Sequence, residues 1–201
     1  MAELHIIGQL ESASDFNAPN SLFCRYSFQT GPNWTLISGF SEGQTASGKE
    51  NFKNSVEWVH PLDLHYVCKG IQGWPKIILQ VSCLDSIGRS WVVGYGCCAL
   101  PSTPGYHTIK VPCWVPAATT VTERLKQYFI GGGHELTQTD IINLGSDRFD
   151  RFIEIIFNKK KIDTIFFCLN RFKLITQSKG EIKLNICIVL RNLTQFGVEY
   201  K

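Results

Sequence analysis

The chain lacks any long hydrophobic run, and this absence excludes one class of protein at once. No apolar stretch approaches the roughly 18–20 residues that a membrane-spanning helix needs. The first residues contain neither a basic segment nor a long apolar segment, so we expect no secretory signal peptide. Among 201 residues, 44% are hydrophobic and 18% are charged, which is typical of a globular protein. We therefore expect one domain, residues 1–201, with a core of its own.

The chain also lacks the cysteine spacing of a metal or disulfide framework. None of its eight cysteines forms a C-x-x-C motif, so a zinc ribbon is not expected. Most of them lie in apolar, strand-like stretches, and we interpret them as reduced thiols that pack as small hydrophobic residues. Cys97 and Cys98 are adjacent and should point to opposite faces of a strand, which makes a shared metal ion difficult.

Motifs of nucleophilic catalysis and phosphate binding are missing too. There is no G-x-S-x-G elbow and no papain-like signature, so a Cys113–His107 pair has only its proximity in sequence to support it. The three glycines at 131–133 lack the Lys-Ser/Thr of a P-loop, and we interpret them as a helix stop. His134 then belongs to a loop.

His60 and His65 are the remaining candidates for a metal or catalytic pair. No third ligand or nucleophile stands at a defined spacing from them, and an odd separation places them on opposite faces of a strand. We assign structural roles to both. The sequence thus predicts no catalytic, cofactor-binding or metal-binding residues and no enzymatic activity.

What the chain does contain is many short strand-like stretches separated by Gly, Pro and Asp turns. Turns are predicted at residues 31–33, 70–75 and 85–88, and loops at 11–15 and 41–51, while Pro61 should break a strand. Such a pattern is typical of an antiparallel sandwich or barrel, and the missing βαβ alternation argues against a nucleotide-binding parallel sheet. The strands are predicted at residues 4–10, 22–30, 34–38, 56–59, 62–68, 76–84, 90–100, 106–111, 173–176 and 181–190.

One short helix is expected at about residues 120–130. Thr120 and Glu123 form a capping box, in which each side chain can bond the other residue's backbone amide. Val121, Leu125 and Phe129 supply an apolar stripe behind it.

Charge is unevenly distributed along the chain. Residues 1–147 carry 9 Lys/Arg against 12 Asp/Glu, whereas residues 148–201 carry 11 against 5. The basic end is either a solvated surface or a surface for an acidic partner or anionic lipid.

The stretch at residues 81–96 resembles a C2 domain, where a strand runs into a metal-binding loop and out again. A calcium site there needs several converging carboxylates, and the two relevant loops offer only Asp15 and Asp85. We therefore predict an all-β, C2-like antiparallel β-sandwich that does not depend on calcium, with one short helix (about residues 120–130) and an atypical insertion near residues 150–170.

Ordered sequence blocks along almost the whole chain resemble the B9-domain family. The combination is specific although each block alone is weak. The blocks are H-I-I-G-Q at 5–9, S-L-F-C at 21–24, E-G-Q-T at 42–45, W-V-H-P-L-D-L-H at 58–65, K-G-I-Q-G-W-P at 69–75, D-S-I-G-R at 85–89, G-Y-G at 94–96, G-G-G at 131–133 and L-R-N-L-T-Q-F-G-V-E at 190–199.

This resemblance implies a scaffold role. Members of the family bind one another in the tectonic-like (Meckel syndrome) complex at the ciliary transition zone, which supports cilium assembly and a membrane diffusion barrier. The implied location is the cytoplasm and cytoskeleton, at the basal body, transition zone and axoneme base. Implied partners are other B9-domain proteins, with membrane phospholipid and tubulin or basal-body components as further candidates, and with no nucleic acid and no cofactor. The alternative is a calcium-independent peripheral membrane module that binds anionic phospholipid.

The chain departs from the family pattern at residues 150–170. This stretch is rich in Ile, Phe, Lys and Asn and separates two segments that are nearly contiguous in the family. It is either a retained intron or gene-model error, or a lineage-specific hairpin that turns at residues 158–161. In both cases we expect it to lie outside the core, while residues 173–176 and 181–190 pair as a hairpin about residues 178–180.

Overall fold

The computed structural model describes residues 1–117 except 19 and 53, residues 122, 125 and 136, and residues 165–196 except 170 and 171. For residues 165–175 and 195 only the backbone is described. No helix within this part of the chain is long and apolar enough to cross a membrane. The elements are β1 (Ala2–Ser14), β2 (Ser21–Gln29), β3 (Trp34–Gly39), β4 (Glu42–Gln44), β5 (Ser55–Cys68), β6 (Lys76–Leu84), β7 (Ser90–Ala99), β8 (Gly105–Pro116), β9 (Ile165–Leu169), β10 (Phe172–Arg191) and the 3-10 helix η1 (Leu193–Phe196).

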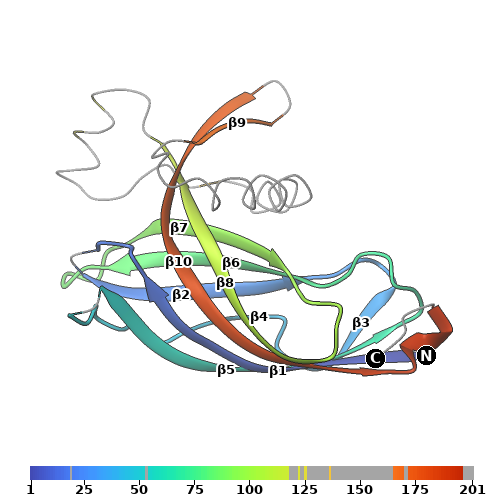
Figure 1. The fold of residues 1–201 in the computed structure, drawn as a ribbon. Coiled ribbons are helices and arrows are strands. Elements are labelled where there is room, and N and C mark those ends of the chain that lie inside the picture. Colours follow the sequence, from blue (N-terminus) through green and yellow to red (C-terminus); the bar gives the residue numbers. More distant parts are fainter. Residues whose placement is uncertain are drawn as a thin grey trace.

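These strands form one antiparallel sheet that curls into two layers (Figure 1). The order is β3-β5-β1-β10-β8-β7-β6-β2-β4, and β9 pairs with β10 outside this path. We call β3, β5, β1, β10 and β8 the first layer, and β7, β6, β2 and β4 the second layer. The layers face each other, since Trp58 Nε1 of β5 donates to the Leu22 carbonyl of β2 at 3.1 Å. The all-β, antiparallel prediction is confirmed.

The core lies between the two layers and follows the alternation of each strand. On β1, Leu4, Ile6 and Leu10 are fully buried while Ile7 points outward and is half exposed. Burying each such Leu or Ile side chain is worth about 1.5–3 kcal/mol. Facing positions that share this core include Leu64 and Tyr66 on β5, Ile77, Leu79 and Val81 on β6, and Ile182, Leu184 and Ile186 on β10.

Two predicted breaks in the first layer were wrong. Residues 11–14, expected in a loop, belong to β1, which continues past a bulge between Leu10 and Ser12. Pro61, expected to break a strand, pairs with Gln9 inside β5. The described pairing of β3 reaches only Leu64 of β5, so Pro61 lies at an open edge where its missing N–H costs no ladder bond.

The predicted hairpin about residues 178–180 was also wrong. Residues 172–191 form one continuous strand, β10, with a bulge against β8 between Ser178 and Glu181. Gly180 adopts φ +70° at this bulge. Both a bulge and a hairpin turn can require a glycine with positive φ. The glycine was therefore correctly recognised as a special backbone position but wrongly assigned to a hairpin turn.

The predicted loop at residues 41–51 contains a short strand, whereas the hairpin at residues 85–88 is confirmed. Within the loop, β4 pairs with β2, and Gly48 forms a bridge with Leu22. In the hairpin, the Asp85 amide donates to the Arg89 carbonyl at 2.9 Å, and Gly88 supplies φ +88°.

Two predictions fall largely outside the described residues. The helix at about residues 120–130 is one of them, since only residues 122 and 125 of that range are described. Of the insertion at residues 150–170, only β9 is described. It pairs with residues 172–176 of β10 and projects from the layers in Figure 1. Whether the insertion can be deleted stays a prediction.

Phe16 fills the core of the sandwich where the two layers join. Its ring is fully buried and packs on two glycines, Gly94 of β7 and Gly180 of β10. Nearby, Tyr95↔Trp114 is the residue pair that joins β7 to β8 in the described ladder. Close packing around a large ring thus replaces a long hydrogen-bonded ladder at this junction.

Substituting Gly180 should reveal this packing. A Cβ at Gly180 would lie 2.6 Å from the Phe16 ring and 2.7 Å from the Ser14 carbonyl oxygen, in a backbone conformation that L-residues avoid. Gly180→Ala should therefore lower the free energy of unfolding by about 2–5 kcal/mol. Gly88→Ala is the control, because Gly88 has a similar φ with no atom within 4 Å of the added Cβ, and it should cost about 1–2 kcal/mol. Equal losses in urea titrations would contradict this account.

Candidate functional site

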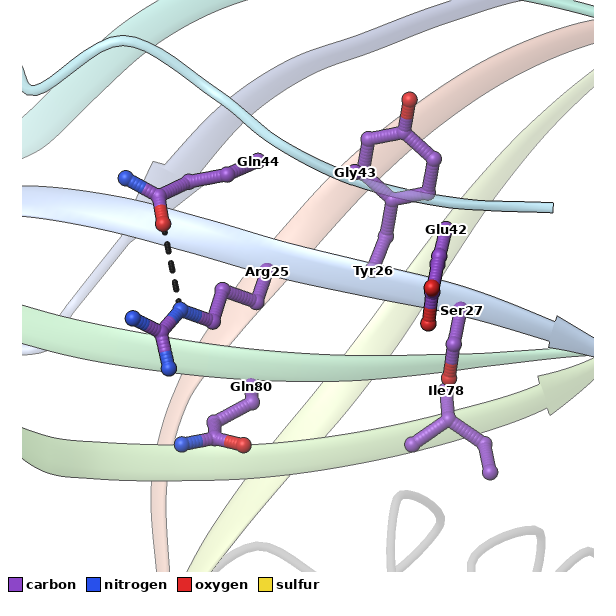
Figure 2. A pocket seen from close by; sticks show the side chains of 8 residues that line it. All are labelled: Arg25, Tyr26, Ser27, Glu42, Gly43, Gln44, Ile78 and Gln80. Atoms are coloured by element: carbon purple, nitrogen blue, oxygen red, sulfur yellow. Dashed lines mark hydrogen bonds between the residues drawn. The ribbon is translucent and has the colours of Figure 1, made fainter. Parts of the chain in front are cut away.

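The second layer carries a hollow of about 430 Å³ on its outer face. Figure 2 shows the side chains around it, which come from β2, β4 and β6. The lining residues are Arg25, Tyr26, Ser27, Glu42, Gly43, Gln44, Ile78 and Gln80. The hollow combines a cation, a carboxylate and two amides with one buried aliphatic side chain.

Strand alternation places these side chains. Cys24 and Tyr26 of β2 point into the core, so Arg25 between them points outward. Arg25 Nε donates to Gln44 Oε1 at 3.1 Å (Figure 2). The Arg25 guanidinium also lies 5.8 Å from the centre of the Phe23 ring. These contacts hold the guanidinium between β2 and β4.

Gly43 allows β4 to pack directly against the Tyr26 ring. A Cβ at Gly43 would lie 2.5 Å from Tyr26 Oη, so only glycine fits against the phenol. Tyr26 Oη makes a 3.2 Å hydrogen bond with His60 Nε2 on the facing layer. Burial raises the pKa of the Tyr26 phenol, so the group stays protonated at neutral pH. The hollow therefore offers hydrogen bonding and charge to a bound partner, without an activated nucleophile among its lining residues.

The Cys113–His107 hypothesis finds no support in the geometry. Both residues lie on β8, six positions apart, which separates them by roughly 20 Å along a strand. Cys113 is buried, and this burial raises the pKa of its thiol well above the usual value. The reactive thiolate is thus disfavoured. His107 Nε2 instead bonds the Thr103 carbonyl at 2.9 Å.

Cysteines elsewhere behave as small hydrophobic residues. Burial raises the pKa of the Cys24 thiol to about 12. Cys98 packs against the main core whereas Cys97 packs against a small outer cluster, so their opposite orientation is confirmed. Free thiols are described at Cys24, Cys68, Cys83, Cys97, Cys98, Cys113 and Cys187.

His60 and His65 face opposite sides of β5, as predicted. His60 reaches inward to Tyr26, while His65 points outward and stacks on His5 of β1, with ring centres 3.7 Å apart. Glu3 lies beside this pair, and ligand atoms of the three residues lie within 4.8 Å of one another. Sequence reasoning missed this group because its members come from two strands. The Glu3–His5 spacing of two residues was the only local signal.

The comparisons with known proteins fix the family. A family described as "Ciliary basal body-associated, B9 protein" (B9-C2) matches residues 4–189. The chain belongs to this B9 family. The B9 domain-containing protein 2 of Danio rerio is 40% identical over 199 residues, which cover 99% of each chain.

Two further comparisons concern another B9 protein and a solved structure. B9 domain-containing protein 1 of Xenopus laevis is 35% identical over 147 residues, covering 72% of this chain and 74% of the relative. A solved C2A domain of a plant extended synaptotagmin 1 covers 94% of both chains, with 9% identity and a TM-score of 0.41. The resemblance found in the sequence blocks is confirmed for the family as a whole.

The two loop carboxylates of this B9 chain are engaged separately. Asp85 Oδ2 accepts a 2.9 Å hydrogen bond from Arg89, and Asp85 Oδ1 accepts from the Ser86 amide. The bond from Arg89, followed by that from Ser86, lowers the pKa of Asp85. Asp15 has φ +61° and donates its amide to the Asn54 carbonyl. The Asp85 carboxylate is thus engaged within its own turn, and among the described residues neither Asp15 nor Asp85 belongs to a cluster of three candidate metal ligands.

We predict that calcium leaves the stability of the protein unchanged. A site filled at a hundred times its Kd would add about 2.7 kcal/mol and raise Tm by roughly 5–10 °C. Thermal unfolding in millimolar calcium should match that in millimolar magnesium, and Asp85→Asn should unfold at the same Tm in both salts. A rise specific to calcium, abolished by Asp85→Asn, would show that this loop binds the ion.

Proposed function

We propose that this chain is a non-enzymatic scaffold subunit of the tectonic-like complex at the ciliary transition zone. It acts there by binding other B9-domain proteins, and so contributes to cilium assembly and the ciliary diffusion barrier. The observation that carries the proposal is the likeness to B9 domain-containing protein 2 across 99% of both chains. We place it in the cytoplasm at the basal body, transition zone and axoneme base, with tubulin or other basal-body components as further candidate partners.

The hollow of the second layer is our candidate docking surface for another B9-domain protein. It lies beside β4, a strand of three residues at one end of the strand order. A strand at the end of a sheet can accept a strand from a partner, because its outer backbone groups are not needed by the sheet. Arg25 and Glu42 at the rim can then select a partner of matching charge.

An exposed aromatic side chain precedes this surface in the chain. Phe40, two residues before β4, is 81% exposed. Aromatic and arginine side chains supply much of the binding energy at protein interfaces. An exposed aromatic residue beside an arginine-containing hollow is therefore consistent with a docking surface.

The ion pairs of β10 weigh against the lipid alternative. Lys183 Nζ lies 2.9 Å from Glu11 Oε1, and the Asn185 amide also donates to Glu11. Arg191 contacts Glu3, and Glu181 binds Lys110 of β8 at 2.9 Å. Part of the described positive charge of β10, that of Lys183 above all, is thus paired within the protein, which weakens its attraction to anionic phospholipid.

The scaffold proposal predicts a stable complex with other B9-domain proteins. Purified together, the chain and B9 domain-containing protein 1 should co-elute in size-exclusion chromatography. Arg25→Glu should weaken this association at least about tenfold, since it reverses a charge at the rim of the hollow. Asp63→Lys, a charge reversal on the exposed face of β5 in the other layer, should leave it unchanged.

The outcomes separate the two parts of this proposal. Failure of folded, unmodified proteins to associate would overturn the scaffold role. Association that Arg25→Glu leaves intact would overturn the docking surface alone, and the exposed edge at β3 would then be the next surface to test.

Liposome binding distinguishes the lipid alternative. We expect no sedimentation of the chain with vesicles containing phosphatidylserine beyond that seen with neutral vesicles at physiological salt. Electrostatic attraction is screened over about 8 Å there and should grow when salt is lowered. Binding that requires anionic lipid and weakens with added salt would favour the membrane module instead.

A further inference from the structure

The outer face of the first layer brings together three side chains that the scaffold role does not use. Glu3 and His5 lie two positions apart on β1, so both point away from the core on which Leu4 packs. β5 runs antiparallel beside β1, and its His65 stands directly opposite His5 in the register. The core packing of β1 and β5 therefore fixes the two imidazoles and the carboxylate on one outer patch.

The geometry of this patch leaves one nitrogen without a hydrogen-bond partner. The His5 and His65 rings are stacked, with an angle of 18° between their planes. His65 Nε2 is shielded from solvent and neither donates nor accepts a hydrogen bond. It lies 3.7 Å from Glu3 Oε2. A shielded polar atom without a hydrogen bond is uncommon in folded proteins and points to a missing partner.

We propose that Glu3, His5 and His65 bind a divalent transition-metal cation of the zinc class. Zinc binds nitrogen and carboxylate ligands at about 2.0–2.2 Å in a tetrahedron, which places two such ligand atoms about 3.4 Å apart. The 3.7 Å gap between His65 Nε2 and Glu3 Oε2 is within a few tenths of an ångström of that distance. His5 supplies the third ligand, since the ligand atoms of all three residues lie within 4.8 Å of one another and side-chain rotation can draw them together.

The donor set selects the kind of cation. Two imidazoles and one carboxylate suit zinc, cobalt, nickel or copper, whereas calcium and magnesium prefer oxygen ligands alone. The side chains of Glu3 and His65 are 26% and 21% exposed, so water can reach the patch and complete the coordination of a bound ion.

Arg191 is the competing partner of Glu3. Its Nη1 lies 3.6 Å from the same Glu3 oxygen, but its side chain is 70% exposed and free to swing into water. Metal binding would thus exchange a long, solvent-screened contact for direct coordination. This site is separate from the hollow, since β1 and β5 belong to the first layer and the hollow lies on the second.

The test is a titration of the purified, metal-free chain with cobalt, which reports its ligands by absorbance, and with zinc in competition. We expect one cation per chain, with the weak visible bands of nitrogen and oxygen ligands and without the intense near-ultraviolet bands of thiolate ligation. His65→Gln and Glu3→Gln should each weaken zinc binding at least about tenfold. Zinc should also raise the Tm of the unmodified chain and not that of either variant.

His107→Gln is the matched control. His107 is another partly exposed histidine on the same layer, bonded to Thr103, and its replacement should leave the affinity unchanged. Circular dichroism of the metal-free variants checks that each one folds. If only one of His65→Gln and Glu3→Gln folds, that variant alone tests the site, and both should fold because both substitutions lie on the outer face. Thiolate bands, an affinity that neither variant reduces, or no cobalt bound at millimolar concentration would overturn the proposal.

Discussion

The pairing of β1 with β5 is the constraint on which most of the described surface depends. Leu4 and Leu64 face the core, and an antiparallel ladder allows no shift of one residue without exposing them. The same ladder then decides which polar side chains meet outside, and it sets His5 against His65. Burial on one face of the sheet thus determines the chemistry available on the other, although the two faces share no side chain.

Much of the fold could be predicted from local sequence, because period-2 alternation and turn residues mark strands one at a time. The residues of β6 and the turn at Gly88 were located in this way. Local patterns failed where a neighbour decided the outcome. Pro61 is tolerated only because β3 stops short of it, and Gly180 forms a bulge because β8 continues alongside. Neither condition can be read from the residues themselves.

The candidate sites were less predictable, for a related reason. Missing motifs argued against a catalytic pair, but no motif could bring Glu3 and His65 together, since they lie 62 positions apart and meet only through the register of two strands. The hollow likewise depends on β4, a strand too short for periodicity to reveal, and on Gly43 fitting against Tyr26. Family resemblance supports a proposed function for the chain, whereas it supplies no residues for either site.

The junction between the layers has a mechanical consequence. Each layer has its own hydrogen-bonded ladder, and Tyr95↔Trp114 is the described pair that links the ladders across β7 and β8, beside the buried ring of Phe16. A small slide of one layer over the other therefore disturbs side-chain packing while most backbone hydrogen bonds persist. The Trp58–Leu22 and Tyr26–His60 hydrogen bonds also cross between the layers, so resistance to such a slide comes from side-chain contacts rather than from a shared backbone ladder.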